Sequence, residues 1–394
     1  MKTNYDVIVV GGGPGGIFAA WEISKSGRTV LLCERKREMG VPVRCAEACG
    51  EEDINKYLPV EERWVAKRTH SFILVLPNGK EVKLSNEKYS GFILNRDLFE
   101  YDMAAKASDN GTKIMMKANV LDLIYHEDGS VKGVKVDENG KINEYFATVV
   151  IAADGVESRI AKKMGINTTL NARDIEPCVQ VTASNVNLKE NALYIYIGTK
   201  YAPGGYAWAF PKANNCANIG LGINGKYATN EKHANDYLDE FLATYYPHVS
   251  VQKRITGGVP VSLTLKTLMK ENMLIVGDAG RMVNPLNGGG ICHAIDSGVL
   301  AGKAAVEACD DPKKIEKIFK KYEKDIYKII GKRHESQYRI KDVIYQMSDE
   351  DYNSIGGEIL KIREDKRSFF HIFSQVVKHK PEFLIDVVKA FTGI

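Results

Sequence analysis

The chain has 394 residues, of which 44% are hydrophobic and 26% charged, and its formal net charge is +4. This composition is typical of a soluble globular protein with two or more structural units, and the charge is too small to indicate a nucleic-acid-binding protein. The seven cysteines show no CxxC pair or zinc spacing, so we expect no metal site. No apolar run is long enough to span a membrane and the first strand starts too early for a signal peptide, so we expect a cytoplasmic protein.

The N-terminal segment predicts a dinucleotide site. Residues 5–16 read YDVIVVGGGPGG, an apolar run typical of a buried parallel strand followed by glycines in GxGxxG spacing. Gly11 permits the tight turn, Gly13 lets the backbone approach a pyrophosphate, and Gly16 lets the following helix pack closely on the strand. The next strand ends in Glu34, which is placed to accept hydrogen bonds from ribose hydroxyls. The alternative is a glycine turn that binds no ligand.

Two later stretches favour a flavin dinucleotide over NAD. Residues 272–291 read NMLIVGDAGRMVNPLNGGGI, which predicts a strand, Asp278 after it, and a helix that begins near Ile291. Asp278 suits ribityl hydroxyls, and the helix N-terminus suits negative charge on the N1–C2=O edge of a reduced flavin. Residues 149–159 predict a strand that runs into Asp154. Each stretch alone is also explained by a simple turn, but the three in this order favour FAD.

These motifs resemble the p-hydroxybenzoate hydroxylase class of FAD enzymes. The resemblance rests on the N-terminal GxGxxG, on ADGVESR in mid-chain and on GDAGRMVNPLNGGGI. The stretch LNRDLFE (94–100) is similar to a motif whose arginine contacts the cofactor, which implies that Arg96 does so here. Val120 falls where the class uses a backbone amide near the adenine.

Within that class the chain resembles the geranylgeranyl reductases, including the archaeal digeranylgeranylglycerophospholipid reductases. GVPVRCAEACG (40–50) is similar to the family's P-V-R-C-G/A-E loop, YAPGGYAWAFP (201–211) to its P-x-x-Y-x-W-x-F-P pattern, and TGGVPVS (256–262) also fits. The resemblance implies reduction by FAD of isolated C=C bonds in geranylgeranyl chains of isoprenoid glycerophospholipids. Together the motifs and the resemblance give these expected FAD contacts: Gly11, Gly13, Gly15, Gly16, Glu34, Arg35, Arg44, Cys45, Ala46, Ala48, Arg96, Val120, Asp154, Asp278, Gly289, Gly290 and Ile291.

The aromatic stretch 201–211 predicts a wall for a polyprenyl chain. Alternation along a strand places the rings of Tyr206, Trp208 and Phe210 on one face. A long apolar chain offers only dispersion and burial energy, about 0.8 kcal/mol per buried CH₂, so a row of rings suits it as a binding surface. The alternative is that the rings are core between a sheet and its covering helix.

An isolated alkene has no carbonyl to polarise, so the protein must supply placement, exclusion of water and a proton. Cys45 is the candidate proton donor, on the substrate side by resemblance, and an arginine such as Arg44 beside a thiol lowers the thiol's pKa. Two alternatives stay open: Cys45 is a packed residue whose backbone alone matters, or it forms a redox pair with Cys49. Cys292 and His293 are expected to be structural.

We expect an α/β fold with a discontinuous Rossmann-like FAD domain, an antiparallel-sheet substrate domain and a small C-terminal helical domain. The FAD domain comprises residues 1–65, 94–172 and 269–330, the substrate domain comprises residues 66–93 and 173–268, and the helical domain comprises residues 331–394. The basic and aromatic tail, residues 366–391, suits contact with a membrane surface, and the alternative is that its helices cap the substrate domain.

The expected partners are a polyprenyl lipid and an electron donor, for which reduced ferredoxin, NAD(P)H and other carriers all stay open. Two rival functions also stay open. One is an aromatic monooxygenase or halogenase that uses O₂. The other is a prenyl-binding carrier without enzymatic activity, which the intact glycine motifs argue against.

Overall fold

The structure, a computed structural model, describes residues 3–85, 91–188, 191–379, 381 and 384–385. The chain folds into two compact units, each built from three separate segments. Unit 1 contains Met1–Val43, Arg96–Thr169 and Ser262–His334, and unit 2 contains Arg44–Asn95, Leu170–Val261 and Glu335–Ile394. The domain boundaries given above rest on sequence motifs and stay a prediction.

Unit 1 is built on an eight-stranded sheet. Its strands are β1 (Asn4–Val10), β2 (Val30–Glu34), β8 (Lys113–Met116), β9 (Ala118–Tyr125), β10 (Val131–Glu138), β11 (Lys141–Ala152), β17 (Met269–Lys270) and β18 (Met273–Ile275). The order is β17-β18-β11-β1-β2-β8, in which β18, β11, β1, β2 and β8 run parallel, and the antiparallel strands β10 and β9 extend from β11. The side chains of Val7 to Val10 are buried, which is why this strand reads as a continuous apolar run. The strand–helix–strand start confirms the predicted Rossmann-like fold.

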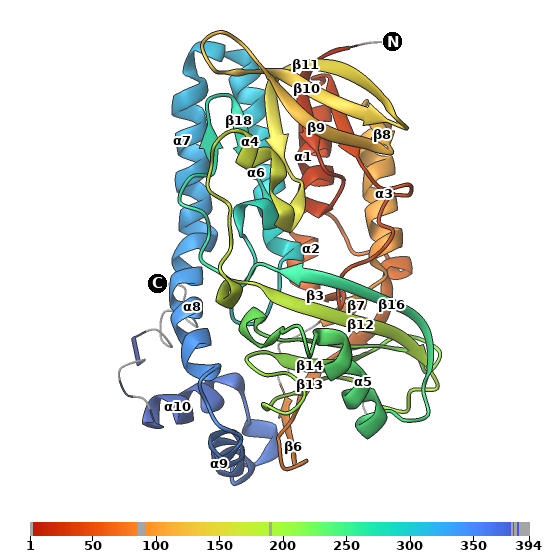
Figure 1. The fold of residues 1–394 in the computed structure, drawn as a ribbon, viewed down its shortest axis with the longest axis vertical. Coiled ribbons are helices and arrows are strands. Elements are labelled where there is room, and N and C mark those ends of the chain that lie inside the picture. The colour runs from red at the N-terminus through yellow and green to blue at the C-terminus, as the bar shows by residue number, and fades with distance from the viewer. Residues whose placement is uncertain (1–2, 86–90, 189–190, 380, 382–383, 386–394) are drawn as a thin grey trace. The chain divides into compact units, whose positions relative to one another are not determined.

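The helices of unit 1 are α1 (Pro14–Ser24), α3 (Arg96–Asp109), α4 (Arg159–Lys163), α6 (Ile291–Asp310) and α7 (Ile315–Ile326). Helix α1 packs against both α3 and α6 (Figure 1). The contact with α6 is close, since a Cβ atom placed on Gly298 would lie 2.2 Å from the carbonyl oxygen of Gly15. A π-helical turn, Tyr327–Gly331, joins α7 to α8 (Lys332–Ile344).

Unit 2 is built on a seven-stranded sheet in the order β16-β12-β15-β14-β13-β5-β6. Its strands are β5 (Ser71–Val75), β6 (Glu81–Ser85), β12 (Glu176–Ser184), β13 (Ala192–Tyr196), β14 (Tyr206–Pro211), β15 (Ala217–Gly222) and β16 (Ser250–Val259). Every neighbouring pair is antiparallel except β13 and β5, which are parallel. This arrangement confirms the predicted second domain built on a mostly antiparallel sheet.

The two faces of this sheet differ. One face carries Val179, Ala207, Ala209 and Ile219, which form an apolar core with side chains of α5 (Ala234–Tyr245). The register places Tyr206, Trp208 and Phe210 at the alternate positions of β14, and therefore on the opposite face.

The remaining elements of unit 2 are short. A three-stranded sheet has the order β3-β7-β4, with β3 (Ala48–Gly50), β4 (Val65–Thr69) and β7 (Gly91–Leu94). The helices are α2 (Glu51–Asn55), α9 (Asp349–Leu360) and α10 (Phe369–His379). Across both units the 3₁₀ turns are Glu62–Trp64, Gly155–Glu157, Ala172–Asp174, Gly225–Tyr227, Gly277–Gly280, Pro312–Lys314 and Glu364–Lys366.

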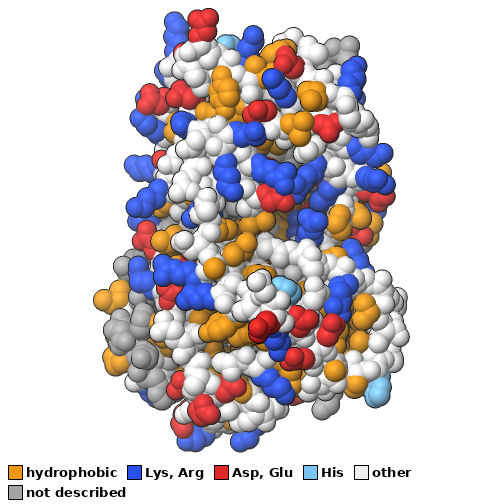
Figure 2. All heavy atoms as spheres, viewed as in Figure 1, with side chains coloured by type: hydrophobic (Ala, Val, Ile, Leu, Met, Phe, Trp, Pro, Cys, Tyr) orange, Lys and Arg blue, Asp and Glu red, His pale blue; other side chains and the backbone are white. Residues whose placement is uncertain are grey.

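The charge of the surface and the apolar content of the helices bear on whether the protein contacts or crosses a membrane. Basic and acidic side chains are interspersed on the face shown in Figure 2, in keeping with the net charge of +4. Within the described ranges, no helix combines the length and apolar content that crossing a bilayer requires. In the predicted surface-binding tail, residues 380, 382–383 and 386–391 lie outside the described residues.

Candidate active site

The glycine turn of unit 1 lies at the start of α1. Gly16 must be glycine for packing, because a Cβ atom there would lie 1.9 Å from the carbonyl oxygen of Gly11. At Gly13, by contrast, a Cβ atom would meet no atom of the described residues within 4 Å. Gly13 is the N-cap of α1, and the first turn of α1 has neither a capping side chain nor an acidic residue. The backbone N–H groups at this helix end are therefore available to an anionic ligand on the open side of Gly13.

Glu34 lies beside this turn at the end of β2. Its side chain is buried, Oε2 accepts a hydrogen bond from the Gly12 N–H at 2.6 Å, and Oε1 accepts one from the Lys36 N–H at 2.8 Å. Each carboxylate oxygen has a second lone pair, so the fixed carboxylate can still accept from ribose hydroxyls. Arg35, the next predicted contact, forms an exposed ion pair with Glu157 at 3.0 Å.

Asp154 has an unused acceptor. Its Oδ2 accepts a hydrogen bond from the Ile160 N–H at 3.0 Å, whereas Oδ1 is buried and has no partner among the described residues. Burial raises the pKa of Asp154, and the Ile160 N–H partly offsets this rise. A buried carboxylate oxygen without a partner is costly, so a ligand donor at this position would stabilise it.

The second helix end carries Asp278. A Cβ atom placed on Gly290, the N-cap of α6, would lie 3.4 Å from Asp278 Oδ1, so the carboxylate lies against the start of this helix. Burial raises the pKa of Asp278, and the positive charge of Arg96 opposes the rise. The first turn of α6, which begins at Ile291, has no side-chain cap and no acidic residue. The geometry therefore provides a free helix N-terminus with an aspartate and an arginine beside it.

The other predicted cofactor residues are placed as follows. Arg96 is the first residue of α3, and its guanidinium pairs with the buried Glu100 one turn later. Val120 lies in β9, opposite Val136 of β10. Unit 1 thus carries Gly11, Gly13, Gly15, Gly16, Glu34, Arg35, Arg96, Val120, Asp154, Asp278, Gly289, Gly290 and Ile291. Arg44, Cys45, Ala46 and Ala48 belong to unit 2, and their contact with FAD stays a prediction.

In unit 2 the three predicted rings form a ladder along β14. The ring centroids of Tyr206 and Trp208 lie 5.8 Å apart, and those of Trp208 and Phe210 lie 6.3 Å apart. Trp208 and Phe210 are buried and cluster with Ile93 and Leu193. Among the described residues this cluster contains no helical side chain, and α5 covers the other face of the sheet. Trp208 and Phe210 thus belong to a buried apolar cluster whose other members come from strands and from the Cys45 segment, and the contact of the rings with substrate stays a prediction.

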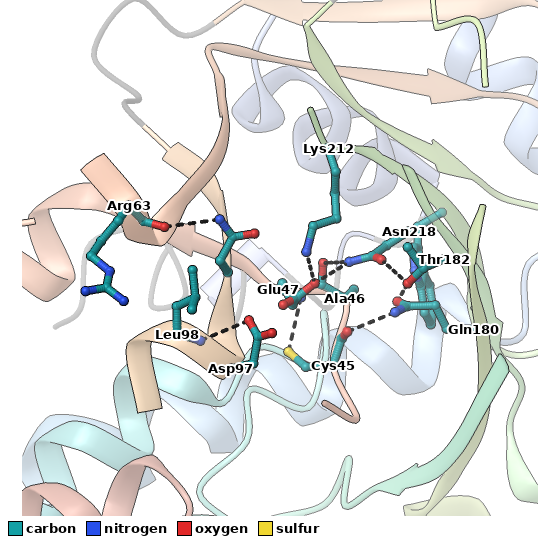
Figure 3. Close-up of polar contacts among 12 residues, drawn as sticks. Cys45, Ala46, Glu47, Arg63, Asp97, Leu98, Gln180, Thr182, Lys212 and Asn218 are labelled. Atoms are coloured by element: carbon teal, nitrogen blue, oxygen red, sulfur yellow. Dashed lines mark hydrogen bonds and ion pairs between the residues drawn. The ribbon is translucent and has the colours of Figure 1, made fainter. Parts of the chain in front are cut away.

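The ladder is joined to the Cys45 segment by one glutamine. The Trp208 Nε1–H donates a hydrogen bond to Gln180 Oε1 at 3.0 Å, and Gln180 Nε2 donates to the carbonyl oxygen of Cys45 at 3.0 Å. Gly220 of the intervening strand makes this possible, since a Cβ atom there would lie 2.6 Å from Trp208 Cζ2. Figure 3 shows Gln180 beside the Cys45 backbone.

Cys45 is half-buried, and its Sγ accepts a hydrogen bond from the Glu47 N–H at 3.2 Å. An N–H donor stabilises the thiolate relative to the thiol, and thiolate is what remains after the thiol gives up its proton. No disulfide joins Cys45 to Cys49, both of which are described residues. The roles of Cys45 as proton donor and redox partner both stay predictions.

A buried acid lies at the start of β12 on the same face as Gln180. Glu176 accepts a hydrogen bond from the hydroxyl of Tyr345, the residue directly after α8, and its Oε2 would lie 3.2 Å from a Cβ atom on Gly222, which is the cross-strand neighbour of Tyr206. Burial raises the pKa of Glu176 to about 7, and the Tyr345 hydrogen bond and the charge of Lys341 oppose the rise. Burial also raises the pKa of the neighbouring Cys178 thiol, which therefore stays protonated at neutral pH, where Glu176 is about half protonated.

Sequence reasoning missed Glu47, Glu176, Gln180, Lys212 and Asn218 as parts of this site. The available signal was β12, in which Cys178, Gln180 and Thr182 alternate with Val179, Val181 and Ala183. Such alternation is usually interpreted as one buried and one solvated face. Here the polar face is covered, because Gln180 exposes only 5% and Asn218 exposes none of its surface.

Comparison with known proteins bears on both units. Residues 174–260, within unit 2, match the family model described as geranylgeranyl reductase catalytic domain. Residues 5–191 match the model described as pyridine nucleotide-disulphide oxidoreductase. A curated relative, digeranylgeranylglycerophospholipid reductase 1 of Methanococcoides burtonii, is 36% identical over 100% of this chain and 96% of its own length.

The chain belongs to the digeranylgeranylglycerophospholipid reductase family. Another member of this reductase family, from Methanocella arvoryzae, is 35% identical over 98% of this chain and 99% of its own length. A solved structure described as geranylgeranyl bacteriochlorophyll reductase-like, from Thermoplasma acidophilum, has a TM-score of 0.92 and 30% identity and covers 99% of this chain and 100% of its own. These matches confirm the predicted family, fold class and FAD cofactor.

This chain also shares its fold with a flavin-dependent brominase. A variant of a flavin-dependent brominase has a TM-score of 0.75 and 15% identity, covering 99% of this chain and 96% of its own. Identity this low shows a common fold alone, so the halogenase alternative has no further support.

The residues of unit 1 fit FAD. The open side of Gly13, the uncapped starts of α1 and α6 and the unpartnered Asp154 Oδ1 are the features that a negatively charged dinucleotide would complete. Glu34 and Asp278 supply acceptors for hydroxyl groups of the cofactor.

Proposed function

We propose that this protein reduces isolated C=C bonds in the geranylgeranyl chains of isoprenoid glycerophospholipids. The observation that carries the proposal is the ring ladder of β14, which lies on the sheet face opposite α5 and is tied through Gln180 to Cys45. This ladder lies within residues 174–260, the segment that matches the reductase catalytic domain, and the relatives named above carry the corresponding name.

The reaction adds one hydride and one proton across the double bond. FAD, when bound and reduced, supplies the hydride for one carbon. Tyr206, Trp208 and Phe210 bind the chain by burial of its methylene groups, which also excludes water. The Cys45 Sγ–H gives its proton to the other carbon and is left as a thiolate, which the hydrogen bond from the Glu47 N–H stabilises.

The test is incubation of the purified, dithionite-reduced protein with the unsaturated lipid in the strict absence of O₂, followed by mass spectrometry. Each step of the proposed reaction adds the mass of two hydrogen atoms to the lipid. Oxidised protein under the same conditions is the control. A lipid that stays unchanged, or that gains oxygen only when air is admitted, would contradict the proposal.

A lipid substrate also requires access to a membrane, and we assign this contact to the tail 366–391, in which α10, Leu384 and Ile385 are among the described residues. Phe370, Leu384 and Ile385 expose 59%, 55% and 65% of their surface. Exposed apolar side chains beside basic ones bind reversibly to anionic bilayers. Flotation with anionic vesicles measures the bound fraction, which falls in Phe370→Ser and stays unchanged in the control Tyr227→Ser, whose side chain is 45% exposed elsewhere in unit 2. Full recovery of the unchanged protein in the soluble fraction at low salt would contradict this contact.

The electron donor is a separate question. Mixing the oxidised protein anaerobically with reduced ferredoxin or with NADPH, and following the bleaching of flavin absorbance, ranks the two carriers. We propose that an external carrier of this kind acts before each lipid step, since one reduced FAD holds the electrons for one double bond.

A further inference from the structure

The segment Cys45-Ala46-Glu47 is fixed to one face of the unit 2 sheet (Figure 3). Glu47 has a φ of 72°, in the left-handed region that non-glycine residues rarely adopt. Its backbone is held on both sides: the N–H donates to Cys45 Sγ at 3.2 Å, and the carbonyl accepts from the Leu94 N–H at 2.8 Å. A strained conformation persists only where the surroundings hold it, so the contacts of the Glu47 side chain become important.

The Glu47 carboxylate is the charged anchor of this segment. Oε2 accepts hydrogen bonds from Lys212 Nζ at 2.7 Å and from Asn218 Nδ2 at 2.6 Å, and Glu47 exposes only 4% of its surface. Hydrogen bonds between ionised groups are shorter and about twice as strong as neutral ones. Lys212 follows β14 and Asn218 lies in β15, so this anchor belongs to the hairpin that carries the ring ladder.

Neutral contacts hold the two residues before Glu47. Gln180 donates to the carbonyl of Cys45 at 3.0 Å, and Asn218 donates to the carbonyl of Ala46 at 3.3 Å. The orientation of the Gln180 amide is fixed, because the Trp208 indole N–H is a donor only and must face the amide oxygen. The segment and the ring ladder are therefore held in one hydrogen-bonded unit.

We propose that Glu47 is a positioning residue for the reductase reaction: its ion pair with Lys212 fixes the backbone turn that directs Cys45 Sγ. Of the two measurements below, only turnover depends on the proposed function, and alkylation of Cys45 does not. The rival interpretation is that the pair only stabilises the fold. The positioning role predicts that Cys45 changes its reactivity when the pair is removed from a protein that still folds, whereas the purely stabilising role predicts that it does not.

The experiment measures alkylation of Cys45 by iodoacetamide in the full-length holoprotein, followed by peptide mass spectrometry. All variants are alkylated at the same pH, so a difference in rate reports a change in the access or ionisation of Sγ, both of which the turn controls. Glu47→Gln and Lys212→Met each remove the charge attraction of the ion pair and so loosen the turn. The double variant does no more than either one, because all three remove that same attraction. We expect Cys45 to react about tenfold faster in each, as a locally opened segment does.

Three controls sharpen the test. Lys212→Arg keeps the charge and restores slow alkylation. Glu240→Gln removes an ion pair with Lys232 of the same 2.7 Å length whose side chains are 50% and 34% exposed, and it leaves Cys45 unchanged. Cys309, half-buried in unit 1, reports whether a variant has opened generally.

Turnover gives the second readout. Misplacement of a reacting group lowers kcat, by up to about 100-fold for a shift of 1 Å, while KM for the lipid changes little. If the protein reduces no lipid but the alkylation rates change as stated, the proposed function fails and the positioning role stands.

Unchanged Cys45 alkylation in well-folded Glu47→Gln and Lys212→Met, with only a lower melting temperature, would overturn the proposal. If these variants do not fold, hydrogen exchange of the unmodified protein decides. The Glu47 and Leu94 amides must exchange slowly, and exchange as fast as in an open loop would overturn the proposal as well.

Discussion

Glu176 makes the stability of unit 2 depend on pH in a direction opposite to that of most carboxylates. Burial raises its pKa from 4.5 to about 7, so the folded state binds the proton more tightly than the unfolded state does. Between these two values the folded protein carries more protons, and the free energy of unfolding therefore falls as pH rises. Each pKa unit represents about 1.4 kcal/mol. Glu176 therefore lowers the free energy of unfolding by about 3 kcal/mol at pH 8, where it is ionised, and does not lower it at pH 4, where it is protonated.

The variant Glu176→Gln removes this cost. A glutamine oxygen still accepts the Tyr345 hydrogen bond, and the amide has no charge to bury. At about pH 8 the variant should be more stable than the unmodified protein by about 3 kcal/mol, or ~6–12 °C in melting temperature for a unit of this size. At about pH 4 the two proteins should melt together. Burial lowers the pKa of His334 to about 3, but this residue is present in both proteins and cancels in the difference.

The assay is a thermal melt of both proteins across this pH range. Glu231→Gln, at an exposed position of unit 2, is the control and should change the melting temperature by no more than about 2 °C. A difference between Glu176→Gln and the unmodified protein that is the same at both ends of the range would refute the reasoning. So would a variant that is less stable at about pH 8.

Four further substitutions test separate parts of the site. Gly13→Ala should fold normally but lose bound FAD, because a Cβ atom there meets no described protein atom within 4 Å and would instead fill space left for the cofactor. Gly16→Ala should lower the melting temperature, because its Cβ atom would lie 1.9 Å from a carbonyl oxygen. Flavin absorbance and circular dichroism distinguish the two variants, and FAD that stays bound to Gly13→Ala would contradict this prediction. Gly220→Ala should push the Trp208 ring from Gln180, costing about 1–3 kcal/mol, with a shift in tryptophan fluorescence; an unshifted spectrum counts against this. Cys45→Ala should lower turnover by about 100-fold or more with the yellow colour intact, and full activity would remove Cys45 from the mechanism.

Local sequence patterns were sufficient for the nucleotide-binding unit. The apolar run of β1, the glycines after it and Glu34 at the end of β2 lie within one strand–helix–strand segment, so their arrangement follows from chain order. The start of α6 at Ile291 was predictable for the same reason, because glycines directly precede a helical pattern. The alternation of rings along β14 is likewise a property of one strand.

The polar half of the site depends on contacts that chain order does not reveal. Tyr345 and Glu176 are 169 residues apart, and Asn218 and Glu47 are 171 residues apart. Gln180 meets Trp208 only because β15 lies between β12 and β14 and presents Gly220 beneath the indole. In a single sequence, Gln180 and Asn218 look like solvent-facing residues of amphipathic strands, and only the covering of that face makes them structural.

The central claim is that the reduced flavin of this protein passes its hydride to an isolated alkene without O₂. Anaerobic stopped-flow mixing of the reduced holoprotein with the unsaturated lipid tests it most directly. The account predicts that oxidised-flavin absorbance returns on mixing, with one double bond lost per flavin, and that the saturated lipid leaves the flavin reduced. Absorbance that returns only when O₂ is admitted would contradict it.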